Sequence, residues 1–402
     1  MKHPVQKLAY GNGDALFLAI GARVQEFDAA TGALRRQWQP EEPAAPVADN
    51  DPPRKKAKVE ASPATNAFRS LCCSPNGKYI IGSTDEQKLL LVFSTENLTL
   101  VSARKFPKRP SAIAITEDST TIFLGDKFGD VYSVPLIDNG DISSSANGFS
   151  KTTTSETESG SELEPIFGHV SMLVDVIVVE SAGVRHIISS DRDEHVRVTQ
   201  YPKSYIIERF CFGHEQFVSQ LVIPAWSPNT LISGGGDDFI AHWDWTNGQL
   251  IEKIEIKSKL IFPPSTAEDD DEKKLENEVA ILGIWPVPEL HVILAYDQST
   301  STLLIFKLDD GKLEYLSQVS ISILDIALTG IDGEIFVSLD NRSEATPESL
   351  IKKFKITAAG QISEIDSEIM SKISAAASYE LVSPIELAWL QPISVLRKRA
   401  EH

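Results

Sequence analysis

The chain has 402 residues, of which 57 are acidic and 38 basic, so its formal net charge is −19 at pH 7 and its pI is near 4.9. This acidity argues against a protein that grips nucleic acid mainly through its own field. The cysteines Cys72, Cys73 and Cys211 show no CxxC or Cys/His spacing, so neither a disulfide framework nor a zinc site is expected. No stretch approaches the roughly 20 apolar residues of a membrane helix, and we expect a soluble intracellular protein.

From the N-terminus the chain reads as short strand-like runs separated by turn residues, beginning with residues 8 to 38. Between 41 and 66 Pro, Ala, Asp and Lys predominate, and few residues remain that could offset the entropy of ordering the backbone. We predict a mobile insertion here. Its run Pro53-Arg54-Lys55-Lys56-Ala57-Lys58-Val59 is typical of the basic signals that importins read, so we predict a nuclear location. The alternative is a solvated cluster of lysines.

Two degenerate repeats and two further insertions can be recognised next. Residues 72 to 83 contain a strand, an SPNGK turn and a second strand, with Pro and Gly presetting the turn. Residues 111 to 134 contain another pair of strands. Mobile insertions are predicted at 139 to 165, which is rich in Ser, Thr, Gly and Glu, and at 264 to 278, which is strongly acidic. By residue count the three insertions together carry a net charge of −10.

The central part of the chain contains two copies of one pattern. Gly168-His169 and Gly213-His214 are 45 residues apart, and each pair precedes two strand-like runs. The aspartates Asp193 and Asp237, which follow the second run of each copy, are 44 residues apart. A Gly-His repeat of this length is typical of WD40 blades.

The repeat length predicts the whole architecture. Residues 279 to 314 and 316 to 362 form two more strand sets without a Gly-His pair. Without the insertions and the tail, the chain has room for seven repeats of roughly 42 residues. We therefore predict an all-β, seven-bladed WD40 β-propeller in residues 1–362, with a C-terminal extension at 363–402 that contains a short helix and packs on it. We expect the N-terminal strand near Val5 to Tyr10 to close the ring by pairing into the last blade.

A WD40 blade contains a buried chain of four polar side chains, which must bond to one another because burying each alone is costly. The second copy supplies all four, namely His214, Ser233, Asp237 and Trp243. The first copy supplies three, namely His169, Ser189 and Asp193. Its fourth position holds Thr199, so we expect a shorter network there. We predict structural roles for these residues. A catalytic Ser/His/Asp arrangement is the alternative, but no Gly-x-Ser-x-Gly or HExxH motif accompanies it.

Four segments resemble one family more closely than WD40 repeats in general. They are Gly125-Asp126-Lys127-Phe128-Gly129-Asp130-Val131-Tyr132, Ser190-Asp191-Arg192-Asp193-Glu194, Tyr201-Pro202-Lys203-Ser204-Tyr205 and Phe210-Cys211-Phe212-Gly213-His214. On these segments the chain resembles the non-catalytic WD-repeat subunit of the eukaryotic tRNA (guanine-N7)-methyltransferase. The resemblance implies a heterodimer in which a separate Rossmann-type subunit binds S-adenosylmethionine and methylates a guanine in the tRNA variable loop. This chain would stabilise that subunit as a regulatory scaffold, with no cofactor or metal of its own, and tRNA would be bound mainly through the partner.

The resemblance also implies a site. In that family a basic residue in the loop matching Asp191-Arg192-Asp193-Glu194 pairs with an acidic residue of the catalytic subunit, and here that residue is Arg192. A guanidinium suits this role because it can bind a carboxylate through two hydrogen bonds. Further partner contacts are expected from four residues, namely Asp191, Lys127, Lys203 and Tyr205. The alternative is an exposed arginine paired locally with Asp191 or Glu194, which would be worth little.

Two other classes of function stay open. A generic nuclear WD40 assembly platform, or a ubiquitin-ligase substrate receptor, would share the fold and the basic run. An enzyme built on a propeller is disfavoured by the WD40 pattern, although a fold alone never excludes a function. No Gly-x-Gly-x-x-Gly follows a strand, so we expect no dinucleotide-type cofactor pocket.

Overall fold

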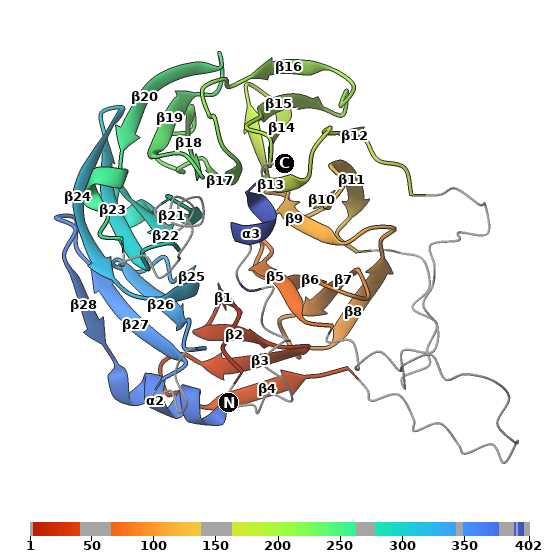
Figure 1. The fold of residues 1–402 in the computed structure, drawn as a ribbon. Helices are drawn as coiled ribbons and strands as arrows, with labels where there is room; N and C mark the ends of the chain where they lie inside the picture. Colours follow the sequence, from red (N-terminus) through yellow and green to blue (C-terminus); the bar gives the residue numbers. More distant parts are fainter. Residues whose placement is uncertain are drawn as a thin grey trace, which may run out of the picture.

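The computed structural model describes residues 3–40, 66–137, 163–262, 278–342, 349–377, 390 and 393–397. These residues form seven four-stranded antiparallel sheets arranged in a ring, the seven-bladed β-propeller that the repeat length predicted (Figure 1). Apart from a few terminal residues, the predicted insertions at 41–66, 139–165 and 264–278 lie outside the described part of the chain, as does the basic run.

Each blade is built from four strands that are consecutive in the sequence. Blades one and two contain β1 (Lys7–Gly11), β2 (Ala15–Ile20), β3 (Arg23–Asp28), β4 (Leu34–Trp38), β5 (Phe68–Cys73), β6 (Tyr79–Thr84), β7 (Leu89–Ser94) and β8 (Leu100–Lys105). Blades three and four contain β9 (Pro110–Ile115), β10 (Thr121–Asp126), β11 (Asp130–Pro135), β12 (Phe167–Gly168), β13 (Leu173–Ser181), β14 (Val184–Asp191), β15 (Val196–Tyr201) and β16 (Ile207–Phe210).

The other three blades follow the same plan. Blades five and six contain β17 (Val218–Val222), β18 (Thr230–Gly235), β19 (Phe239–Asp244), β20 (Gln249–Glu255), β21 (Ile281–Val287), β22 (Val292–Asp297), β23 (Thr302–Asp309) and β24 (Lys312–Ser320). Blade seven contains β25 (Ile323–Leu328), β26 (Glu334–Leu339), β27 (Ile351–Ile356) and β28 (Ile362–Ile365). Two short 3-10 helices, Lys257–Lys259 and Pro288–Leu290, and two α-helices, α2 (Ser367–Ala376) and α3 (Ile393–Leu396), complete the described elements.

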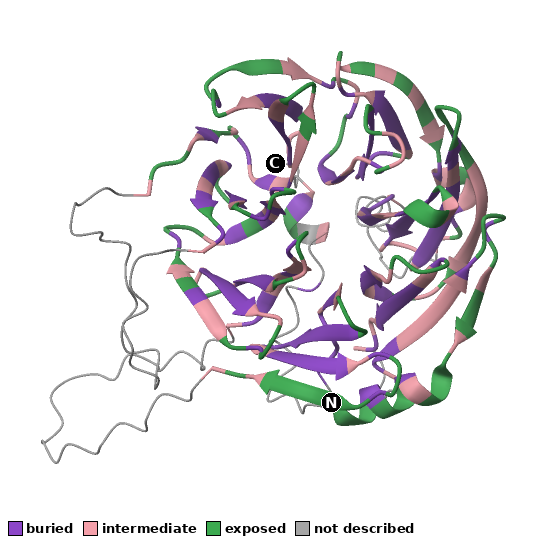
Figure 2. Ribbon diagram, turned by 180° about the vertical axis from the view of Figure 1, so that it is seen from behind, coloured by how far each residue is buried: buried purple, intermediate pink, exposed green. Residues whose placement is uncertain are grey.

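The core lies between neighbouring blades. The second strand of a blade is covered on both faces, so its sequence is a continuous apolar run, as in Ala15–Ile20, where every residue is buried. The outer strands face solvent and are largely polar, as in β4 and β20 (Figure 2). Burial of the middle strands therefore holds the blades together, and the turns at the ends of the strands remain available for other contacts.

The boundary between the last two blades differs from the predicted one between 314 and 316. Strands β23 and β24 form a hairpin whose two turn residues, Asp310 and Gly311, have φ angles of 51° and 73°. Positive φ at both positions is typical of the tight type I′ turn that joins adjacent strands. Residues up to Ser320 therefore belong to blade six, and blade seven begins at Ile323. Its last strand ends at Ile365, three residues beyond the predicted limit of the propeller.

The prediction that the N-terminal strand pairs into the last blade is wrong. Strand β1 is the inner strand of blade one and pairs with β2, while blade seven takes its outer strand from Ile362–Ile365. Since that place is already filled, no strand exchange is needed. The first and last blades meet instead through Asp325, whose carboxylate accepts the backbone N–H of Leu8 at 2.8 Å and lies 3.6 Å from Nζ of Lys7.

Helix α2 covers the seam between the first and last blades. Met370 and Ile373 are buried in one cluster with Leu16 of blade one and Phe336 of blade seven. The hydroxyl of Ser374 accepts the backbone N–H of Leu350, at 3.0 Å, which ties the helix to the start of β27. The helix lies beside β27 at the rim of the ring (Figure 1). The residues after the last strand thus close the ring by packing.

We expect Ile373→Ala to destabilise the propeller by about 2–4 kcal/mol, because the cavity would open at the seam. The free energy of unfolding from denaturant titration measures this. Lys372→Ala is the matched control, since Lys372 lies on the exposed face of the same helix and pairs with the exposed Glu368; its effect should stay within about 0.5 kcal/mol. Equal effects of the two substitutions would contradict the role given to α2.

Candidate partner-binding face

The four residues predicted to form the network of blade five are joined in one hydrogen-bonded chain. The ring of His214 lies 2.6 Å from the carboxylate of Asp237 and 2.7 Å from the hydroxyl of Ser233. Nε1–H of Trp243 donates to the same hydroxyl at 2.8 Å. All four side chains are buried, so the chain satisfies polar groups that water cannot reach. It fixes the connection that enters β17 against the end of β18.

The chain in blade four uses a different aspartate from the predicted one. Nδ1 of His169 lies 2.9 Å from the carboxylate of Asp191, and Nε2 lies 2.8 Å from the hydroxyl of Ser189. Asp191 is only 2% exposed. Asp193 lies outside this chain and accepts the hydroxyl of Ser171 at 2.8 Å. The assignment of Asp193 to the network was therefore wrong, and so was the assignment of Asp191 to the partner contact, because its carboxylate is buried and already bonded.

The two blades use different aspartates because the space for a side chain at the end of the second strand differs. Asp191 and Gly235 hold equivalent places, opposite Leu173 and Val218 at the start of the first strand of each blade. A Cβ at Gly235 would lie 1.8 Å from the carbonyl oxygen of Phe217. Blade five therefore has no side chain there, and its aspartate comes two residues later. Blade four has room for a side chain at the end of its second strand. Asp191 in that position reaches His169 directly.

Asp191 is held as an anion. Burial alone would raise its pKa, but the ring of His169 and the backbone N–H groups of His195 and Asp193 bond to its carboxylate and bring its pKa below the usual value. The buried side chain of Asp191 thus joins the connection that enters β13, the end of β14 and the turn that follows β14.

Thr199 occupies the place that Trp243 has in blade five, and the network of blade four is accordingly shorter. Thr199 lies opposite Ile187 on β14. Its hydroxyl accepts a hydrogen bond from Nε of the buried Arg197 at 2.9 Å. The guanidinium of Arg197 also donates to the carbonyl of Gly168 at 3.1 Å and lies 4.5 Å from the ring centroid of Phe167. Arg197 therefore links blade four to β12, the outer strand of blade three.

The turn between β14 and β15 is fastened at three points to the connection that enters β13. Besides the bonds made by Asp191 and Asp193, the backbone N–H of Arg192 donates to the carbonyl of Met172 at 3.0 Å. The side chain of Arg192 is 37% exposed, and its Nε lies 3.9 Å from the carboxylate of Asp193, too far for a hydrogen bond. The backbone is therefore fixed, while among the described residues the guanidinium makes only a long local ion pair.

Exposed apolar side chains lie on both sides of this turn. In the β10–β11 turn Phe128 is 54% exposed, and Nζ of Lys127 and of Lys108 lie 5.2 and 4.7 Å from its ring centroid. Val170, fully exposed, stands in the connection that leads to β13. On the other side Phe212 is 70% exposed, and its ring stacks on Phe210 at 5.2 Å.

Hydrogen bonds and ring contacts between neighbouring turns join these residues into one surface. The backbone N–H of His169 donates to the carbonyl of Gly129, at 2.9 Å, which brings the turn of Phe128 beside the connection of Val170. The ring of His195, in the turn of Arg192, lies 6.1 Å from that of Phe210. We define the docking face by four exposed side chains and one half-buried arginine, namely Lys127, Phe128, Val170, Phe212 and Arg192.

Sequence reasoning missed Phe128, Val170 and Phe212. A signal was present, because each stands in a turn or connection beside Gly129, Gly213 or the Gly168-His169 pair, where polar residues are usual. Their exposure, which distinguishes a contact surface from a core residue, required the structure.

Lys203 and Tyr205 lie elsewhere on blade four. Their loop joins the far end of β15 to β16, and it folds back so that the hydroxyl of Ser204 donates to the carbonyl of Ile166 at 2.7 Å. Lys203 is exposed, and Tyr205 is 78% exposed. The two side chains therefore lie at the rim beside blade three, whereas Lys127 and Arg192 occupy equivalent turns at one end of the ring.

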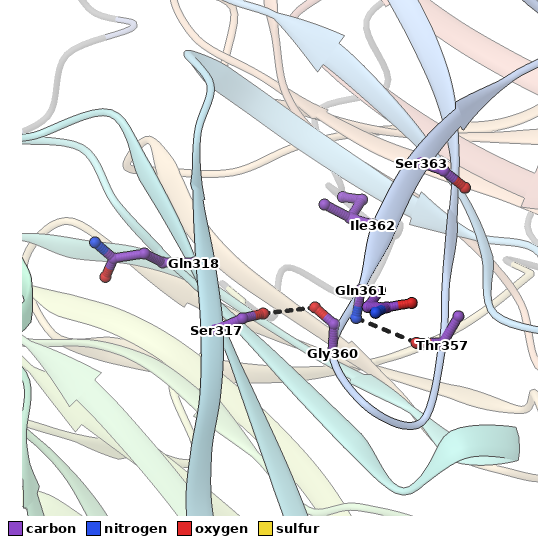
Figure 3. Close-up of a pocket in the computed structure, with 7 residues that line it drawn as sticks. All are labelled: Ser317, Gln318, Thr357, Gly360, Gln361, Ile362 and Ser363. Carbon is purple, nitrogen blue, oxygen red and sulfur yellow. Dashed lines mark hydrogen bonds between the residues drawn. The ribbon is translucent and has the colours of Figure 1, made fainter.

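Other kinds of site find little support. Among the described residues no group of three or more His, Cys, Asp or Glu side chains is placed to hold a metal ion. All three cysteines are unpaired, and burial raises the pKa of each thiol to about 12. No described helix has the length and apolarity needed to cross a membrane. A hollow of about 510 Å³ lies between β24 and β28, where Ser317 donates to the carbonyl of Gly360 (Figure 3).

Comparison with known proteins gives consistent matches. The family model described as "tRNA methyltransferase TRM82 WD40 domain" matches residues 16–160 and 145–363. A relative from Debaryomyces hansenii, named tRNA (guanine-N(7)-)-methyltransferase non-catalytic subunit TRM82, is 30% identical over 465 aligned residues, covering 100% of both chains. A relative of the same name from Aspergillus clavatus is 33% identical, covering 84% of this chain and 78% of the relative.

Solved structures show the same fold. A chain of "Crystal Structure of Mitotic Checkpoint Complex" has a TM-score of 0.59 at 14% identity, covering 85% of this chain and 88% of that one. A chain of "Structure of U3-55K" has a TM-score of 0.59 at 13% identity, covering 84% and 88%. At this identity the likeness concerns the propeller alone.

The two aspartates of blade four should respond differently to substitution. We expect Asp191→Ala to cost about 2–4 kcal/mol in the free energy of unfolding, because it leaves His169 and two backbone N–H groups without their buried partner. Asp193→Ala should cost less than about 1 kcal/mol, since its side chain is 32% exposed. Denaturant titration of both variants decides the assignment, and the reverse order would restore Asp193 to the network.

Proposed function

This chain belongs to the TRM82 family of WD40 proteins, the non-catalytic subunits of tRNA (guanine-N7)-methyltransferase, and on that premise we propose that it binds and stabilises the catalytic subunit through the docking face. The subunit so held would be the S-adenosylmethionine-dependent enzyme that forms N7-methylguanosine in the variable loop of tRNA. The two proteins would form a heterodimer.

The observation that carries this proposal is the state of Arg192. Its backbone is bonded to Met172, and within the described part of the chain its guanidinium has only a long local ion pair. A charged anchor on a rigid backbone loses little conformational entropy on binding. The exposed Phe128, Val170 and Phe212 around it would exclude water from the contact. An acidic side chain on an apolar surface of the catalytic subunit fits this arrangement.

The charge of the chain supports a division of labour. With a net charge of −19, the chain as a whole repels the tRNA backbone. In the proposed heterodimer tRNA is therefore held mainly through the catalytic subunit. We also propose that the complex works in the nucleus, on the basis of the basic run at 53–59. Loss of nuclear fluorescence after substitution of its lysines by alanine would test that location.

Arg192→Glu should weaken binding of the catalytic subunit by roughly 30-fold or more, because it places like charges at the contact. Calorimetric titration of one purified subunit with the other measures the Kd, and N7-methylation of tRNA gives a second readout. Arg185→Glu is the matched control, since Arg185 lies on β14 at the end away from the turn of Arg192, paired with Asp118 at 3.1 Å. An unchanged Kd for Arg192→Glu, or equal losses in both variants, would refute the assignment.

A further inference from the structure

The described C-terminal segment lies inside the ring. Helix α3 stands in the centre, surrounded by the inner strands of the blades (Figure 1). Leu396 is 5% exposed and packs in a buried cluster with Phe217 of the connection to β17 and Ala280 of the connection to β21. Ile393 packs against the same cluster. The segment therefore contacts blades that are not consecutive with it in the sequence.

A largely buried arginine anchors the segment on blade six. The guanidinium of Arg397 donates to the carboxylate of Glu278 and, at 2.8 Å, to the carbonyl of Val279. Its side chain is only 9% exposed. A charge so far removed from water needs these partners, so the position of Arg397 fixes the end of α3 at the entrance to β21.

The same segment supports the turn that carries Arg192. The side chain of Met172 packs against the cluster of Leu396, and the carbonyl of Met172 accepts the backbone N–H of Arg192 at 3.0 Å. Its neighbour Ser171 donates to Asp193 in that turn. Of the residues that hold the turn in place, Met172 therefore also packs against the cluster of α3.

We propose that the C-terminal segment, through Leu396 and Arg397, is a positioning element that fixes the turn of Arg192 for the catalytic subunit. The inference rests on the proposed function of Arg192. Leu396 and Arg397 act through Met172 and the connection that enters β13. The cores between blades four and five and between blades three and four are separate clusters that do not include Leu396. Loss of its side chain would thus loosen the turn locally and leave the ring folded.

Hydrogen exchange and binding of the full-length chain test this proposal together. Leu396→Ala should speed amide exchange in residues 190–195 and raise the Kd for the catalytic subunit roughly 3- to 30-fold, the range of indirect coupling. Arg397→Gln should act in the same direction. Val395→Ala is the matched control, because Val395 lies on the same helix but is 50% exposed; it should change neither readout. Unchanged exchange in the middle strands β18 and β22 shows that the variants are folded.

A double-mutant cycle separates positioning from direct contact. If Leu396 acts through Arg192, then Leu396→Ala should have little further effect on the Kd in an Arg192→Ala background. Equal weakening in both backgrounds, or unchanged exchange at 190–195, would overturn the proposal. If Arg192→Ala alone leaves the Kd unchanged, the role of Arg192 in the proposed function fails, whereas the exchange of the turn still shows whether α3 holds it.

Discussion

The docking face depends on the buried contact between His169 and Asp191. Neither side chain can be left without a partner in the core, so the connection that enters blade four and the end of its second strand must meet at one geometry. Arg192 is the next residue, and its position follows from that contact. Blade five shows the contrast, because the acidic Asp238 in its turn pairs with Lys257 at 3.0 Å and its charge is used locally.

Much of the fold followed from the sequence. The remainder depended on the space available to side chains, which a sequence does not show. The Gly-His repeat predicted seven blades, and the network residues of blade five were recognised by type. Equal spacing matched Asp193 with Asp237, but the lack of room for a side chain at Gly235 shows that the two turns differ. The outer strand Ile362–Ile365 was hidden at the start of an apparent tail, so ring closure was misjudged. The turn Asp310-Gly311 did carry a signal for the boundary of blade six.

The C-terminal residues serve the propeller at two places. Helix α2 covers the seam between the first and last blades, and the segment of Leu396 and Arg397 packs against the connections that enter β13, β17 and β21. Membership of the TRM82 family replaces the more general alternatives of an assembly platform or a propeller enzyme. An acidic propeller that presents an arginine among exposed apolar side chains is suited to bind an acidic protein surface.

In the proposed heterodimer the catalytic subunit binds the end of the ring formed by the turns of blades three and four. A hydrogen-exchange footprint of the full-length chain, with and without the catalytic subunit, tests this most directly. We expect new protection in residues 126–130, 168–172, 190–195 and 210–213, and no change in blades one, six and seven. Protection confined to the opposite end of the ring, or to the blade-six and blade-seven rim, would contradict it.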